Sequence, residues 1–533
     1  MGRLDRLFAA AFVLVTGAVA ALVLLAYDLW EVRRVTIGLM PNWVWTGTAA
    51  ALVSACAVRA KRMPRLDRGA PIRLRTLVLL CGAVLCAQAF VCAMIYREQL
   101  YDAIIVLNAA YCNAMGYPQY RDVAYFSRYP NNLFLLALET AVLTLLRMLG
   151  IEPGMDRCTL LFVLGQCVLN AASGVLTVLL AQHCARACGL SGRETGRTGR
   201  LAWGLWLVLI GTSAWLTVIY SDSMTVLFPV LLLYLYTRRG AGKRAVLMYA
   251  AIGCIGGLAF KFKPQSGLSL IAMVLVDACA LLARRVRART FLFRLAAMAA
   301  AAAMVFGPGT RLAQKISQME LDPQQEFGVT HFLNLGLNTQ THGIFSPEDL
   351  ERSQQAQTKA ERDRVNLQSA KQRLEEMGPA GLAEHLFNKT MINFADGSFQ
   401  LDDFLSTPRE EKQGLERLLE EIFHHDGVYR PLVHTVRQGA WVLVLMLCPF
   451  AALAYLAARR GEEMRGADAI LAMMLTVTGV MVFNMLFEAR GRYIFSNVPV
   501  MIALAVTGFG ALMQRVKETS NPQDAGCIAD KPQ

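Results

Sequence analysis

Long apolar runs alternate with short polar segments along most of the chain. Runs of about 17 to 25 apolar residues can cross a ~30 Å hydrocarbon layer as helices, which satisfy their own backbone hydrogen bonds within the lipid. We therefore predict an all-α polytopic membrane protein. The pattern predicts about twelve crossings, at residues 7–28, 41–58, 76–96, 158–181, 201–219, 224–237, 245–260, 265–283, 291–308, 439–457, 467–487 and 496–514.

Composition favours the same class. Of the 533 residues, 55% are hydrophobic and 17% are charged, whereas about 25% are charged in a typical soluble domain. The first apolar run follows a basic start, as in a signal peptide, but it lacks a clear small-residue cleavage site. We expect this run to be retained as an anchor.

Positive charge gathers in short loops between the predicted spans. This positive-inside pattern predicts cytoplasmic loops and explains the net charge of +13 without nucleic-acid binding. The apolar segment 132–149 would break the alternation if it crossed fully, so we expect a shallow or re-entrant helix with both ends on the outer face. The basic stretches lie at 59–75, 185–200, 238–244, 284–289 and 458–465.

The alternation also suggests how the chain is divided. Within the external part, Ser346 as N-cap, Pro347 in the first turn and Gly378 as a stop predict one long helix, and a second, amphipathic helix follows to Phe394. The predicted segments are an N-terminal transmembrane hairpin with a basic cytoplasmic loop (1–75), a transmembrane core (76–309) with an external loop (97–131), an external helical insert (310–437), C-terminal transmembrane helices (438–515) and a cytoplasmic tail (516–533).

Acidic and basic side chains recur where the predicted spans reach the outer face. Asp102 lies just beyond the span 76–96, where lowered dielectric can raise the basicity of a carboxylate; a solvated loop acid is the alternative. Further charged residues occur in the stretches YSDSM (220–224), FKFKP (260–264) and FEARGRYIFSNVPV (487–500), and the stretch YFSRYPNN (125–132) leads into an apolar helix.

An acid just past a span, followed by an aromatic-proline motif before the next apolar helix, resembles the first external loop of GT-C class polytopic glycosyltransferases. The chain is similar in particular to bacterial members of the protein O-mannosyltransferase family (glycosyltransferase family 39) and their aminoarabinose-transferring relatives. The resemblance covers most of residues 76–515. The chain differs from the family in having two additional spans before this region. It also lacks the adjacent Asp-Glu pair of the mannosyltransferases, so the identity of the transferred sugar is not implied.

The resemblance implies that Asp102 is the catalytic base, with Glu98 and Asp122 as less favoured alternatives. It implies transfer of a sugar from a polyprenyl-phosphate-linked donor to a protein, lipid or cell-wall polymer, within the membrane lipids at the outer face of the plasma membrane. Residues expected to bind substrate are Arg128, Tyr129, Asn131, Asp222, Lys263, Arg490, Arg492 and Tyr493.

The chemistry of such a donor suits these residues. A polyprenyl phosphate leaves as an anion, so departure needs cations more than a general acid, and arginine favours bidentate contacts with phosphate oxygens. Purely structural roles are the alternatives: Asp222 as a helix N-cap, Lys261 and Lys263 as interface anchors, and Arg490 and Arg492 paired with Glu488 or snorkelling to the interface.

Other chemistries have weaker signals. A divalent cation, magnesium or manganese, could assist, but the carboxylates are too sparse to assign ligands. Six of the seven histidines fall in the insert without HExxH spacing, which favours structural or acceptor-facing roles over zinc. A transporter or lipid flippase is the alternative function, although related halves with mid-membrane charges are not evident. A scaffold that displays the insert is a third possibility.

Overall fold

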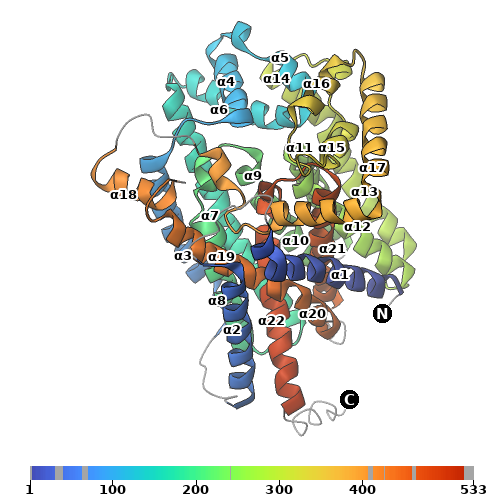
Figure 1. Ribbon diagram of the computed structural model, residues 1–533. Helices are drawn as coiled ribbons and strands as arrows, with labels where there is room; N and C mark the ends of the chain where they lie inside the picture. The colour runs from blue at the N-terminus through green and yellow to red at the C-terminus, as the bar shows by residue number, and fades with distance from the viewer. Residues whose placement is uncertain are drawn as a thin grey trace.

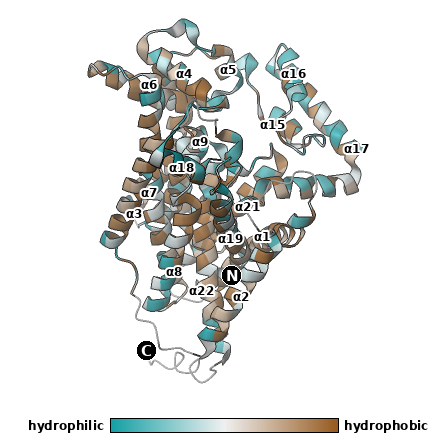
Figure 2. Cartoon of the chain, turned by 60° about the vertical axis from the view of Figure 1, so that its left-hand side comes forward, coloured by the Kyte–Doolittle hydropathy of each residue, from teal (hydrophilic) through white to brown (hydrophobic). Residues whose placement is uncertain are grey.

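The computed structural model describes residues 3–30, 40–62, 70–240, 242–405, 412–424, 426–458 and 464–520 (Figure 1). Helix accounts for 83% of the structure, and the described residues contain no strand. The prediction of an all-α polytopic membrane protein is therefore confirmed. Figure 2 shows hydrophobic residues concentrated along the long helices, whereas the insert is more hydrophilic.

Ten helical segments of the described residues are long and apolar enough to cross a membrane. Nine of the twelve predicted crossings are among them, and the tenth corresponds to the segment 132–149. The helices of these segments are α1 (Arg3–Ala26), α3 (Leu74–Ile95), α6 (Leu133–Met148), α7 (Met155–Ala187), α11 (Gly242–Phe262), α12 (Pro264–Leu282), α13 (Ala288–Met304), α19 (Arg430–Leu447) with α20 (Ala451–Ala458), α21 (Met464–Leu486) and α22 (Val498–Ser520).

The other three predicted crossings differ from a regular long span. The segment 41–58 is helical in α2 (Asn42–Arg62) but is less apolar than those ten. The segment 224–237 is a short helix, α10 (Leu227–Thr237), preceded by α9 (Ser221–Met224).

The segment 201–219 is not one helix. It begins in α8 (Gly192–Trp206), continues as a π-turn (Leu207–Gly211) and ends in a 3₁₀ turn (Ala214–Thr217). The buried Arg437 of α19 donates to the carbonyl oxygen of Thr212 just beyond the π-turn. A cation from a distant part of the chain thus satisfies a backbone group that a continued helix would have paired.

The loops that alternate between the two predicted faces do gather at two ends. Asp468 accepts hydrogen bonds from Arg239 and Arg285, both at 2.7 Å, and Glu194 pairs with Lys517; all of these lie in or beside segments predicted to be cytoplasmic. At the other end, Figure 1 shows α4 (Tyr101–Met115), α5 (Val123–Arg128), α14 (Thr310–Ser317) and α16 (Pro347–Gln355) together, far from the free ends of α2 and α22.

The helix α6 belongs to the end that carries the external loop. It packs against α4 and α14, and Figure 1 shows the three helices close to one another. Such a position is what a shallow or re-entrant helix would have. The helix is also long and apolar enough to span, so its membrane placement stays a prediction.

The insert contains more helices than the sequence pattern predicts. Ser346 caps α16 as expected, by accepting from the backbone N–H of Asp349 at 3.3 Å. The predicted long helix is interrupted, because Thr358 caps a second helix, α17 (Lys359–Phe394). Gly378, with φ at +59°, marks a sharp bend in α17, in agreement with its expected role as a stop. The helices α15 (Val329–Gly336) and α18 (Gly414–Phe423) complete this region.

Candidate functional site

The carboxylate of Asp102 is the centre of a hydrogen-bond network at the start of α4. Its Oδ1 accepts from the Tyr125 hydroxyl at 2.7 Å, and its Oδ2 accepts from the Tyr220 hydroxyl at 3.1 Å. The side-chain amide of Asn132 donates to the Tyr125 hydroxyl at 2.6 Å. Asp102 itself stays partly exposed. We call these four residues the Asp102 network.

Local helix caps and turns bring the members of the Asp102 network together. Asp122 accepts from the backbone N–H of Tyr125 at 2.8 Å and so caps α5. This cap fixes the short helix that carries Tyr125. Asp122 is exposed and Glu98 is exposed too, whereas Asp102 has two tyrosine partners. Among the three acids, Asp102 is the one whose carboxylate accepts hydrogen bonds from two tyrosine hydroxyls.

Both tyrosines of the network stay protonated at neutral pH. Burial is the main cause that raises the pKa of Tyr125, with smaller contributions from Tyr220 and Asp102. Burial also raises the pKa of Tyr220 most strongly, and Asp102 adds to this shift. The hydroxyl groups therefore act as donors to the carboxylate.

A buried ion triad lies next to this network. Asp222 has a fully buried carboxylate, which pairs with Lys263 through Oδ1 and with Arg492 through Oδ2, the latter at 3.2 Å. The side chains of Lys263 and Arg492 are only 5% and 9% exposed. The triad holds two cations and one anion, and Nε of Arg492 has no hydrogen-bond partner among the described residues.

Tyr220 joins the Asp102 network to the ion triad. The guanidinium carbon of Arg492 lies 5.1 Å from the centre of the Tyr220 ring, and the hydroxyl of the same ring reaches Asp102. Phe404, from the insert, also packs against Arg492, with its ring centre 4.6 Å from the guanidinium carbon. Asp102 and Arg492, far apart in the sequence, thus both contact the side chain of Tyr220.

A third group of charges lies beside Arg492 toward the insert. The Tyr493 hydroxyl donates to Glu488 at 2.7 Å, and its ring centre lies 4.8 Å from the Lys263 ammonium. Arg490 donates to Asp403 at 3.1 Å and lies 3.9 Å from Glu488. Arg490 therefore has acidic partners, in agreement with the alternative in which it pairs with Glu488.

Of the remaining predicted substrate-binding residues, Tyr129 lies beside the Asp102 network. The Tyr129 ring packs against Tyr125 and Phe327, with centres 5.2 Å apart in both pairs. Burial is the main cause that raises the pKa of Tyr129, followed by Asp102 and Glu488. Arg128 is half-buried, its Nε has no hydrogen-bond partner among the described residues, and Asn131 is exposed.

Two of the purely structural roles considered as alternatives are wrong. Asp222 does not cap a helix, because Tyr220 is the N-cap of α9 and the Asp222 carboxylate binds two cations instead. Lys263 is not an interface anchor, because it is buried against that carboxylate. Lys261 fits the anchor interpretation better, since it is partly exposed and lies over the ring of Phe306 at 4.9 Å.

Sequence reasoning gave no role to Tyr125, Asn132, Tyr220 or Phe404, although Tyr125 and Asn132 lie in the stretch 125–132 that carries the resemblance. Tyr220 stands two residues before the candidate Asp222, so its proximity to the site could have been noticed. Tyrosines at span ends are common for interfacial reasons alone, which hides a specific role. For Phe404 the sequence holds no signal, because it reaches the site only through the fold of the insert.

The insert histidines make hydrogen bonds within the protein. His331 contacts the Ser353 hydroxyl, His385 the carbonyl of Gly336 and His434 the carboxylate of Asp396, each at 2.8 Å. Within the part of the chain that the structure describes, no group of three or more His, Cys, Asp or Glu side chains could hold a metal ion.

The fold and its spans define a multi-pass integral membrane protein. The chain belongs to the family described as conserved hypothetical integral membrane protein, whose profile matches residues 49–511. This match extends from α2 to α22 and includes every residue of the site. No curated protein matches the chain.

Proposed function

We propose that the protein is a membrane glycosyltransferase that moves a sugar from a polyprenyl-phosphate donor to an acceptor hydroxyl at the outer face of the plasma membrane. The observation that carries this proposal is that Tyr220 links a tyrosine-held carboxylate, Asp102, to a triad of two cations and one carboxylate, because its hydroxyl donates to Asp102 and its ring lies against Arg492. A base beside an anion-binding group is what such a transfer requires.

In the proposed reaction Asp102 removes the proton from the acceptor hydroxyl. The acceptor oxygen forms a bond to the anomeric carbon from the face opposite the phosphate, so the configuration inverts. The bond between the anomeric carbon and the phosphate oxygen breaks, and its electron pair leaves with the polyprenyl phosphate. Asp102 then releases its proton to water, and the cations stabilise the departing phosphate.

The charge balance of the triad supports the role given to the cations. Within the triad two buried cations share a single carboxylate, an excess of one positive charge that Asp102 and Glu488 offset only from a greater distance, and a buried charge without a direct partner is costly. A phosphate of the donor would compensate that charge. Arg492 is the favoured contact because its Nε keeps an unused N–H, and Arg128 offers a second guanidinium whose Nε also has no hydrogen-bond partner among the described residues.

Transfer of radiolabelled sugar by the purified protein in detergent tests the proposal. Wild type is compared with Asp102→Asn and with Glu98→Gln, an exposed acid four residues away. Loss of a general base is expected to slow transfer by about 10²- to 10⁴-fold, and Glu98→Gln should keep its rate. The proposal fails if wild type transfers nothing from any polyprenyl-phosphate donor, or if folded Asp102→Asn keeps its full rate.

The alternative of a lipid flippase has a separate outcome. A flippase reconstituted in vesicles would move labelled polyprenyl phosphate between leaflets without an acceptor and without product formation. The glycosyltransferase proposal expects acceptor-dependent product instead. We favour the glycosyltransferase over the flippase because the charges of the site lie at one end of the helices.

A further inference from the structure

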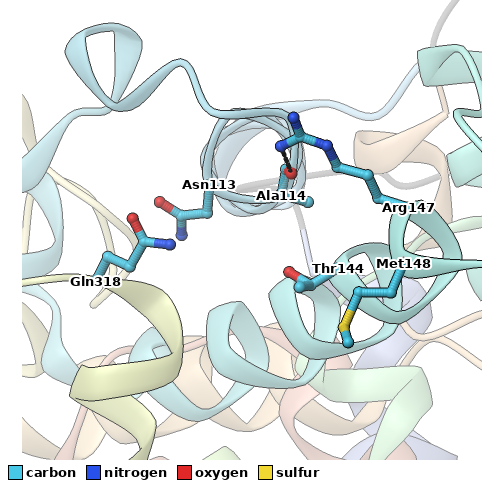
Figure 3. A pocket seen from close by; sticks show the side chains of 6 residues that line it. All are labelled: Asn113, Ala114, Thr144, Arg147, Met148 and Gln318. Atoms are coloured by element: carbon cyan, nitrogen blue, oxygen red, sulfur yellow. Dashed lines mark hydrogen bonds between the residues drawn. The ribbon is translucent and has the colours of Figure 1, made fainter.

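A polar cavity lies at the far end of α4 from Asp102. Its volume is about 390 Å³, within the ~300–1,000 Å³ of small-molecule sites. Figure 3 shows side chains from three helices directed into it. Its lining residues are Asn113, Ala114, Thr144, Arg147, Met148 and Gln318.

The lining offers hydrogen-bonding groups of both kinds. Thr144 and Gln318 are exposed, and among the described residues the Thr144 hydroxyl and the Gln318 amide make no hydrogen bond within the protein, so both are available to a ligand. The Asn113 amide donates to Thr140 at 3.1 Å and accepts from Arg121 at 2.7 Å, which leaves one of its two N–H groups unused. Amides and hydroxyls both donate and accept, so this set matches a ligand with hydroxyl groups, which do the same.

The electrostatics of the cavity disfavour a phosphate. The C-terminal ends of α4, α6 and α14 meet there, and helix C-termini carry partial negative charge. Two arginines are already bound by these ends: Arg147 donates to the carbonyl of Ala114 at 2.7 Å, and Arg121 to the carbonyl of Gln318 at 2.8 Å. The helix ends offset part of their charge, and the carboxylate of Glu152 lies 3.7 Å from Arg147, so a neutral ligand fits better than an anion.

We propose that this cavity holds one sugar residue of an extended acceptor glycan. The inference rests on the proposed glycosyltransferase function and narrows its acceptor to a saccharide chain. Asp102 and Asn113 stand at opposite ends of α4, about 16 Å apart along its axis at ~1.5 Å per residue. An acceptor that reaches both points must be longer than a single sugar. Met148 and Ala114 would pack against the apolar face of the ring.

Binding of free saccharides tests the inference independently of transfer. The full chain in phosphatidylcholine nanodiscs is mixed with mannose, glucose, cellobiose or chitobiose, and saturation-transfer NMR reports contact and affinity. The test variant joins Thr144→Val with Gln318→Gly. Valine keeps the shape of Thr144, and glycine accepts the positive φ of +49° at Gln318, so both changes remove hydrogen-bonding groups with little effect on the backbone.

The expected result is saccharide binding by wild type that is about tenfold weaker in the double variant. Thr48→Val, on an exposed face of α2, is the matched control and should bind as wild type. Asp102→Asn should also bind as wild type, because it removes only the proposed chemistry. Binding that is unaffected by the double variant would overturn the inference.

Two further outcomes separate this inference from the proposed function. If inorganic phosphate or phosphatidylglycerol nanodiscs compete for the cavity and saccharides do not bind, the cavity is an anion site and the inference is wrong. If no saccharide binds while sugar transfer by wild type is normal, the inference fails and the transferase stands. If saccharides bind as expected but no transfer occurs from any donor, the cavity is a saccharide site and its role for an acceptor is withdrawn.

Discussion

Removal of the Asp222 carboxylate leaves two buried cations without their anion. The Asp222 side chain is 0% exposed, and its partners Lys263 and Arg492 are 5% and 9% exposed. Breaking a buried ion pair by deleting one partner costs about 3–5 kcal/mol. We therefore expect Asp222→Asn to lower the free energy of unfolding by about that amount. Equilibrium unfolding in mixed micelles, followed by tryptophan fluorescence during an SDS titration, measures the change.

A matched control is available in Asp403→Asn. The Asp403 side chain is 40% exposed and pairs with the less buried Arg490, and exposed pairs contribute about 0–1 kcal/mol. Adding Lys263→Met to Asp222→Asn removes one uncompensated cation, so the double variant should be more stable than Asp222→Asn alone. The reasoning is refuted if Asp222→Asn costs no more than Asp403→Asn, or if the second substitution brings no recovery.

Three further predictions concern the site, the insert and the topology. Tyr220→Phe removes one hydrogen bond to the Asp102 carboxylate and should slow sugar transfer about tenfold, as initial rates would show. Burial lowers the pKa of Lys389 to about 7 in the folded protein. Above pH 7 the unfolded chain therefore binds more protons than the folded chain, so the stability of wild type rises with pH up to the ordinary pKa of lysine. Denaturation measured at several pH values should show that Lys389→Met lacks this rise. In intact cells, a cysteine introduced at Gln340 should react with an impermeant thiol reagent. A cysteine introduced at Gly240 should not react.

The spans could be predicted because an apolar run of membrane length has few other interpretations. The same reasoning failed at 201–219, where the helix turns into a π-turn whose end is bound by Arg437. That partner lies 225 residues away in the sequence. A local pattern carries no information about such a contact. The break in the insert at Thr358 was missed because the polar sequence on either side is equally helical in character.

The charged members of the site could be predicted one by one, because a charge beside a span is unusual and stands out. Asp102, Asp222 and Arg492 were found in this way. The sequence could not show that Tyr220 contacts both Asp102 and Arg492, or that Lys263 is buried. These facts depend on helix packing, which brings together residues from four separate parts of the chain.

In this account Arg492 binds the phosphate of the donor, whereas Asp102 acts only as the base. A measurement of phosphate binding therefore distinguishes the two roles. Equilibrium binding of polyprenyl phosphate is measured for wild type, Asp102→Asn and Arg492→Gln, with the exposed Arg311→Gln as the control. We predict that Asp102→Asn and the control bind as wild type, and that Arg492→Gln binds at least about tenfold more weakly. Equal binding by all four proteins, or binding by none, would contradict the account.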